Sequence, residues 1–322
     1  MENFKAMGNM KRLETLCIAG AVAVLAVSCG KEGAVREDRA SEVEFTASEL
    51  QVKTVFGEKA DGAYPVLWTS NEKVALFYNS QTGDQTGGGQ YADVLPSADG
   101  HTAGFSASFT DDGNGSHSFY AMSPLSALNG MGNEDWDGNG VNEKILYANI
   151  PYDQIPVPGT CDEKAQIVFA KEEFSEFPDK VDLTFSHMTA YGLITSLSLP
   201  EEATEIVGLT IESDKFLSGE IYCNYNTPET ILCNAKKAQK YIYLDVNNGG
   251  LKAKKLENVF FACTPQTDGN DVFGEGDYLK FKVYTDTDTW VKTVNFSADR
   301  TLAFKAGRIS SFSVSAHGFE KQ

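Results

Sequence analysis

Residues 181–199, VDLTFSHMTAYGLITSLSL, decide the fold class of this chain. Apolar side chains recur at every second position from Val181, Leu183 and Phe185 onward, and small or polar residues fill most positions between them. A period of two is typical of a β-strand with one face on a core. The stretch is much longer than an ordinary strand of about 5–6 residues. We therefore expect two collinear strands that leave one domain and enter the next, with a break near 190–192; a bent pair within one large sandwich is the alternative.

The rest of the folded chain also alternates over short segments that turn residues separate. Seven such segments follow Leu199, at 205–211, 220–224, 240–246, 258–263, 278–284, 290–296 and 309–314. No helix of ordinary length is evident before Pro200. Many short strands with turns between them predict an all-β chain built of β-sandwiches. The length of 322 residues is enough for two domains, which we place at 42–180 and 181–322.

The composition limits the partners. Hydrophobic residues make up 42% of the chain and the formal net charge is −18. The hydrophobic content excludes a disordered chain. The net charge argues against nucleic acid and anionic membrane surfaces as partners, because both carry negative charge.

Residues 1–28 have the features of a secretory signal. Lys11 and Arg12 precede an apolar run at 16–27, and small residues lead directly to Cys29. This arrangement resembles a bacterial lipobox, in which the cysteine is lipidated and becomes the new N-terminus. We expect Cys29 to carry acyl chains that partition into a membrane, with residues 29–41 as a flexible tether; plain secretion is the alternative.

Four segments resemble motifs of the fimbrillin family of Bacteroidales, the Mfa-like and FimA-like (type V) pilin lipoproteins. They are Trp68-x-x-x-Glu72-x-Val74-x-Leu76-Phe77, Phe119-Tyr120-Ala121 with Pro124, Leu183-x-Phe185-x-His187-x-x-Ala190, and Phe304-x-Ala306-Gly307-Arg308. The resemblance covers residues 42–316. It implies two transthyretin-like β-sandwich domains in tandem, displayed as a lipoprotein on the cell outer membrane or in a fimbrium. It also implies other pilus subunits as partners through strand exchange, and a host or bacterial surface ligand.

In the family members that form shafts, an arginine- or lysine-specific protease removes the first strand, and a strand of the next subunit replaces it. Here Arg36 and Arg39 precede the first expected strand, and the next arginine is Arg300. Cutting at either early arginine would release the lipid and remove no strand, whereas cutting at Lys53 would remove one. The residues after Val314 make a poor donor strand. Both departures favour an anchor, tip or accessory subunit, or a stand-alone surface lipoprotein, over a shaft subunit; an adhesin is a further role open to such a protein.

Residues 133–143, NEDWDGNGVNE, are the densest group of oxygen ligands. Asp135, Asp137, Asn139 and the glycine after them match the first half of a calcium loop, and Glu143 supplies another oxygen. Leu146 stands where the bidentate glutamate belongs. A calcium loop and a solvated acidic loop both remain open, and no other cofactor is expected.

Cys223 and Cys233 flank a short polar turn, so a disulfide across a hairpin and a pair of buried free thiols are both open. The chain has no CxxC pair, which makes a zinc site unexpected.

No catalytic motif is present, so we expect no enzyme. His187 alternates with apolar residues and is expected to be a core or junction histidine with a satisfied hydrogen bond. Trp136 and Trp290 are candidate platforms for sugar rings, since Trp290 alternates with Lys292. They support the alternative function, a surface glycan-binding β-sandwich lipoprotein.

Overall fold

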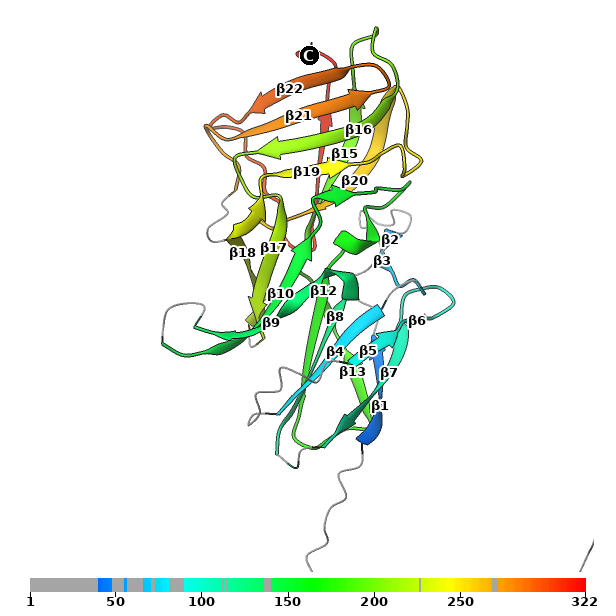
Figure 1. The fold of residues 1–322 in the computed structure, drawn as a ribbon, viewed down its shortest axis with the longest axis vertical. Helices are drawn as coiled ribbons and strands as arrows, with labels where there is room; N and C mark the ends of the chain where they lie inside the picture. The colour runs from blue at the N-terminus through cyan, green and yellow to red at the C-terminus, as the bar shows by residue number, and fades with distance from the viewer. Residues whose placement is uncertain are drawn as a thin grey trace, which may run out of the picture. The chain divides into compact units, whose positions relative to one another are not determined.

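The computed structural model describes residues 40–322 except positions 48–54, 57–65, 71–72, 81–89, 112, 114, 136–139, 226 and 268–271. The described chain consists of β-strands, with two short 3-10 helices, η1 (Leu125–Ala127) and η2 (Glu163–Ala165). The prediction of an all-β fold is confirmed. All seven strands predicted after Leu199 are present (Figure 1).

Two sheets enclose a first core. One has the order β13 (Lys180–Leu183), β1 (Ala40–Ala47), β7 (Ala103–Thr110) and β6 (Leu95–Pro96). The other has the order β14 (Phe185–His187), β12 (Val168–Phe174), β8 (His117–Ser123), β4 (Lys73–Ser80) and β5 (Gln90–Asp93). Aromatic rings dominate the space between them, including Phe45, Phe105 and Phe119. Trp68 is buried there against Phe185, with ring centroids 5.1 Å apart, as expected for a core tryptophan.

A four-stranded sheet covers the other face of the five-stranded one. Its order is β18 (Thr227–Gln239), β17 (Ser218–Asn224), β10 (Glu143–Ile150) and β9 (Leu128–Glu134). Leu146 and Ile221 of this sheet share a cluster with Tyr120 and Phe169 of the five-stranded sheet. The centre of the five-stranded sheet is therefore buried on both faces, and every side chain of β8 is buried, whereas the edge strand β5 is mostly exposed.

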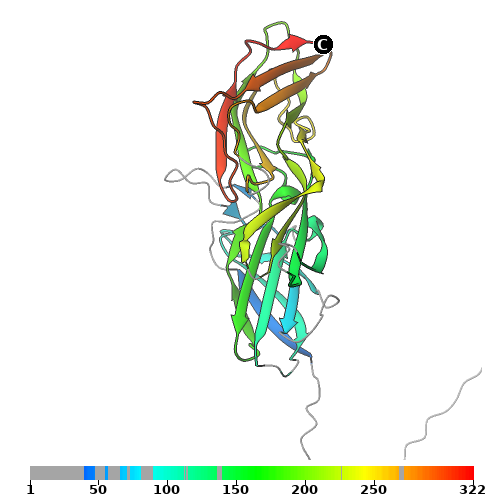
Figure 2. The same cartoon turned by 90° about the vertical axis from the view of Figure 1, so that its left-hand side faces the viewer.

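A further pair of sheets encloses the largest core. The three-stranded sheet has the order β20 (Lys255–Cys263), β15 (Ala190–Ser198) and β23 (Ile309–Val314). The six-stranded sheet has the order β11 (Asp153–Gln154), β19 (Tyr241–Leu244), β16 (Ile206–Ser213), β21 (Tyr278–Thr285), β22 (Thr289–Asn295) and β24 (Glu320–Lys321). Figure 1 looks onto the six-stranded sheet, and Figure 2 shows the same elements turned by 90°. β2 (Val55–Phe56) and β3 (Val66–Leu67) form a separate pair.

The chain passes from the first set of sheets to the second at Met188 and Thr189, between β14 and β15. The predicted break therefore exists, just before the expected position. Alternation of buried and exposed residues holds from Val181 to Ser186, but residues 188–194 are all buried because packed groups cover both faces of the chain there.

Hydrogen bonding interleaves the two halves of the sequence. β10 pairs with β17, and β11 pairs with β19, so strands from before position 180 join strands from after it. β13 and β14 pair with β1 and β12, although they follow position 179. The division into 42–180 and 181–322 stays a prediction about folding units.

Candidate functional site

The first strand of the described chain occupies a central position in its sheet. β1 runs antiparallel to β7 over eight residue pairs, from Ala40↔Thr110 to Ala47↔Ala103. It runs parallel to β13 over four pairs, from Glu44↔Lys180 to Ala47↔Leu183. We call this position between β7 and β13 the β1 slot. Without β1, both neighbours would present unpaired backbone groups to a replacement strand.

The inner face of β1 is a large part of the first core. Val43, Phe45 and Ala47 are each at most 1% exposed. The ring of Phe45 stacks on Phe105 with centroids 5.7 Å apart, and it meets the rings of Phe109 and Phe119 edge-on. A replacement strand therefore has to supply apolar side chains at alternate positions.

The outer face of β1 is polar and makes one side-chain link to β13. Glu42 and Glu44 are exposed. The hydroxyl of Thr46 donates to the carboxylate of Asp182, which also forms an ion pair with Lys180 at 3.1 Å. Hydrogen bonds from Thr46 and then Lys180 hold the pKa of Asp182 below its ordinary value. The hydrogen bond from Thr46 has a negatively charged acceptor only while Asp182 is ionised.

The residues predicted to be lipidated or cut lie outside the described residues: Cys29, Arg36, Arg39 and Lys53. Their positions in the sequence relative to β1 are nevertheless informative. Arg39 directly precedes Ala40, the first residue of β1, so a cut after Arg39 would leave the whole strand attached. A cut after Lys53 would separate β1 from the rest of the chain.

The residues after β23 are held by the six-stranded sheet. β24 pairs with β22 through Trp290↔Lys321 and Val291↔Glu320, and Phe319 is buried. Lys321 forms an ion pair with Asp288 at 2.7 Å. These contacts oppose the use of this segment as a donor strand, in line with the prediction from its sequence.

The four sequence motifs contact one another in space. Trp68 packs on Phe185, which joins the first motif to the third. The strand pairing Phe77↔Tyr120 joins the first motif to the second. Gly307 of the fourth motif donates its N–H to the carbonyl of Thr189, next to His187. Residues separated by as much as 239 positions, Trp68 and Gly307, therefore belong to one connected group of contacts.

His187 lies where the chain crosses between the sheets. It is half-buried, and its Nδ1 is 2.8 Å from the hydroxyl of Tyr191, so the expectation of a satisfied junction histidine is confirmed. Gly307 has φ +69°, and a Cβ there would approach the His187 ring to 3.1 Å. The fourth motif needs glycine for both reasons.

The predicted calcium loop is only partly described, because Asp137 and Asn139 lie outside the described residues. Asp135 accepts a hydrogen bond from the N–H of Gly140 at 3.0 Å. Glu143 begins β10. Among the described residues, no three His, Cys, Asp or Glu side chains are grouped to hold a metal ion. Calcium binding by the complete loop stays a prediction.

The two cysteines on β17 and β18 are free thiols in this structure. The register explains why: Cys223 pairs with Ile231, and Cys233 pairs with Ile221. Each cysteine is thus diagonal to the other, and diagonal positions on neighbouring strands lie about 7–8 Å apart, too far for a disulfide without backbone movement. Burial raises the pKa of the Cys233 thiol to about 12.

One residue assignment from the sequence needs correction. Trp290 is 3% exposed and belongs to the largest core, because the side of β22 that carries it faces that core. It therefore cannot be a platform for sugar rings. His117, which lies in a polar stretch of the sequence, is also buried, with its Nδ1 2.7 Å from the Tyr78 hydroxyl. Trp136 lies outside the described residues.

Sequence reasoning missed a polar aromatic face on the six-stranded sheet, which Tyr241, Tyr243 and Tyr284 line. The signal was available, since tyrosine and lysine alternate with buried residues along β19 and β21.

Within the described ranges, no helix has both the length and the apolar character needed to cross a membrane.

Comparisons with known proteins give no match to a family and none to a curated protein. Solved structures with similar folds include a candidate cell adhesion protein from Bacteroides ovatus, with 13% identity, TM-score 0.48 and coverage of 89% of this chain and 97% of that one. Another, from Bacteroides fragilis, has 10% identity, TM-score 0.46 and coverage of 88% and 97%. A fimbrial assembly protein from Parabacteroides distasonis has 11% identity, TM-score 0.40 and coverage of 88% and 94%. At identities and scores this low, a likeness is not evidence of a shared function.

Proposed function

We propose that this chain is a fimbrillin-like surface lipoprotein that acts as a pilus subunit or pilus-associated adhesin. It is anchored in the outer membrane through Cys29, joins other subunits by strand exchange at the β1 slot, and presents a surface ligand site without catalysis. The observation that carries the proposal is the β1 slot. β1 is the first described strand of the chain, lies between two partners, and inserts three alternate side chains into the core. A strand from another chain with the same alternation would satisfy the same backbone and core groups.

The four motifs that resemble the fimbrillin family support the same proposal. The motifs are separate along the sequence, and in the fold each of them contacts at least one other. Such contacts are expected if the motifs maintain one architecture.

The chain acts as an anchor, tip or accessory subunit rather than a shaft subunit. The arginines before β1 cannot release it when cut, since β1 starts at Ala40. The segment after β23 pairs with β22, and its Phe319 is buried. This segment is therefore not available as a donor strand for another subunit. A subunit that keeps its own first strand cannot accept a strand from another subunit, so a chain of subunits joined by strand exchange stops at it.

The test is to compare cleavage on the two sides of β1. The full chain, with the exposed Arg300 and Arg308 replaced by lysine, is treated with an arginine-specific protease, either with Lys53 kept or with Lys53→Arg, and intact mass identifies the products. A labelled peptide with the sequence of β1, ASEVEFTA, is then added. We expect the peptide to replace β1 after cleavage at position 53 and to be excluded after cleavage at Arg39, where β1 remains covalently attached.

The matched control is the same peptide with the phenylalanine that corresponds to Phe45 replaced by aspartate, which cannot enter the core. Strand exchange is excluded as the mechanism if the cleaved Lys53→Arg protein stays folded and takes up neither peptide, or takes up both equally. In protein taken from the native surface, an N-terminal peptide that starts at acylated Cys29 supports the anchored state.

A further inference from the structure

The outer side of the six-stranded sheet carries aromatic rings at adjacent positions of its ladder. Strand register places Tyr243, Thr210 and Lys282 in one row across β19, β16 and β21, and Gly208 beside Tyr284 in the next row. Tyr241 lies two residues from Tyr243 on the same side of β19. We call these six residues the tyrosine face. Their strand neighbours Leu209, Ile242, Phe281 and Val283 point the other way into the largest core.

The Tyr243 ring lies along the sheet rather than away from it. A Cβ at Gly208 would come within 2.6 Å of the Tyr243 hydroxyl, so glycine is what allows this ring to cross the strand. The rings of Tyr243 and Tyr284 have centroids 6.0 Å apart, and Tyr152 continues the series at 5.5 Å from Tyr241. The tyrosines are half-exposed on the face and already held in place before any ligand arrives.

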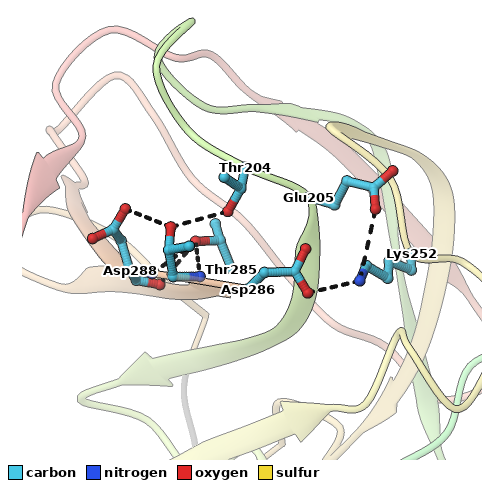
Figure 3. A network of polar contacts seen from close by, with 7 residues as sticks. Thr204, Glu205, Lys252, Thr285, Asp286 and Asp288 are labelled. Carbon is cyan, nitrogen blue, oxygen red and sulfur yellow. Dashed lines mark hydrogen bonds and ion pairs between the residues drawn. The ribbon is translucent and has the colours of Figure 1, made fainter.

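β21 places two lysines on this side of the sheet, and they differ in their charged neighbours. Lys280 is neutralised by Glu212 at 2.8 Å. At the adjoining β21–β22 turn, Lys252 lies between Asp286 at 2.7 Å and Glu205 at 3.7 Å (Figure 3). Lys282 has no ion pair with a described residue, and its ammonium lies 5.4 Å from the centre of the Tyr284 ring. Exposed Asp153 pairs in register with Tyr243, so this row carries a carboxylate at its β11 end. Its β21 end carries the Lys282 ammonium, beside the Tyr284 ring, which is inclined at 68° to the ring of Tyr243.

We propose that the tyrosine face binds a polysaccharide chain that contains acidic sugars. The flat tyrosine rings would stack on the apolar faces of successive sugar rings, and Lys282 would pair with a carboxylate or sulfate on one of them. The series from Tyr152 to Tyr284 crosses three strands, which suits an extended chain better than a single sugar.

Other polymers fit less well. Nucleic acid presents a charge at every nucleotide and needs several cations, whereas β21 places two lysines on this face and Glu212 neutralises one of them. A large apolar protein surface would meet polar groups here, because the exposed large aliphatic side chains of the described chain, such as Leu95, Val141 and Ile155, lie elsewhere. A glycan with acidic sugars spaced among neutral ones matches both the rings and the single charge.

This inference goes beyond strand exchange and does not depend on it, because the tyrosine face and the β1 slot belong to different sheets. If the strand-exchange proposal fails, the proposal for the tyrosine face still stands, and the reverse also holds. The two experiments have separate readouts.

The test is affinity electrophoresis of the purified full chain. Gels contain partly de-esterified homogalacturonan, the same polymer fully methyl-esterified, carrageenan, or no polymer. An ionic strength of about 0.15 M limits repulsion by the net charge to about 8 Å. We expect retardation by the de-esterified polymer to exceed retardation by the esterified one; carrageenan distinguishes sulfate from carboxylate as the preferred anion.

Three variants assign the binding to the face. Lys282→Gln should weaken retardation by the acidic polymer about three- to ten-fold. Tyr243→Ala should weaken it at least about five-fold, because a stacking surface is lost. Lys254→Gln is the matched control, since Lys254 is an exposed lysine in another part of the chain and its substitution removes the same charge. Thermal unfolding confirms that each variant is folded.

The inference is overturned if no polymer retards the chain, or if the esterified and de-esterified polymers act equally and Lys282→Gln changes nothing. It is also overturned if the chain self-associates and Tyr243→Ala abolishes that association without affecting migration in the polymer gels. The face would then be an interface between copies.

Discussion

Truncating Phe45 tests whether β1 is as deeply integrated as its contacts imply. The side chain is 1% exposed, and its ring contacts those of Phe105, Phe109 and Phe119. Replacing a buried phenylalanine by alanine costs about 3–5 kcal/mol, from lost apolar burial and the cavity left behind. A typical domain is stable by about 5–15 kcal/mol, so Phe45→Ala should remove a large share of the stability of the sheet that contains β1.

Urea unfolding measures the loss in stability, and native-state hydrogen exchange locates it. The amides of β7 should exchange faster in Phe45→Ala, because β7 pairs with β1 along eight residues. The amides of β16, in the six-stranded sheet, should change little. Glu42→Ala is the control on the same strand; it is exposed on the opposite face and should cost less than about 0.5 kcal/mol.

A loss below about 1 kcal/mol for Phe45→Ala, with unchanged exchange in β7, would refute the reasoning, because burial of this ring would then contribute little. A large loss spread evenly over all sheets would instead mean that β1 cannot open alone. Strand exchange requires local opening, so that outcome would also weaken the proposed mechanism.

Four further predictions follow from other contacts. Gly307→Ala should cost about 1–2 kcal/mol more than Gly250→Ala in urea unfolding, since both residues have positive φ but only Gly307 abuts His187; equal losses would contradict the role of that contact. Glu220→Ala should destabilise the chain by about 1–3 kcal/mol, because the buried carboxylate accepts hydrogen bonds from Asn129, Asn234 and Lys237; Lys237→Ala, at an exposed partner, should cost less. The folded-state pKa of Asp182 is lowered, so its contribution is present above about pH 4 and is lost as the pH falls through the folded pKa; Asp182→Asn should flatten this acid dependence by less than about 1 kcal/mol. Thiol titration after unfolding without reductant should find Cys161, Cys223, Cys233 and Cys263 all reactive, and loss of the Cys223 and Cys233 signals would show a disulfide that the register opposes.

The strand pattern was predictable wherever one face of a strand meets a core and the other meets water. β21 is the clearest case: buried and half-exposed residues alternate along its whole length, as its sequence does. The pattern fails in β8, where all seven residues are buried. Sheets pack on both sides of β8, so the period of two no longer reports the surroundings.

The candidate site was predictable in part. The sequence predicts that Arg36 and Arg39 precede the first strand, and the structure agrees, although β1 begins at Ala40, a few residues earlier than the alternation indicates. The burial of Trp290 did not follow, because alternation says that two faces differ and gives no indication of which one turns inward. The tyrosine face needed three strands, distant in sequence, to be aligned in register.

The amino-acid sequence alone was enough to predict the all-β class, the strand segments after Leu199, the chain crossing near position 190 and the motifs that resemble a pilin family. These depend on local periodicity and local residue chemistry, which each segment carries without its neighbours. The packing of distant segments is what makes β10 pair with β17, sets Cys223 and Cys233 out of register, and brings the Lys282 ammonium beside the Tyr284 ring. Strand partnership and register arise from packing of distant segments, because backbone hydrogen bonds between strands are the same for every sequence and only side-chain burial chooses among them.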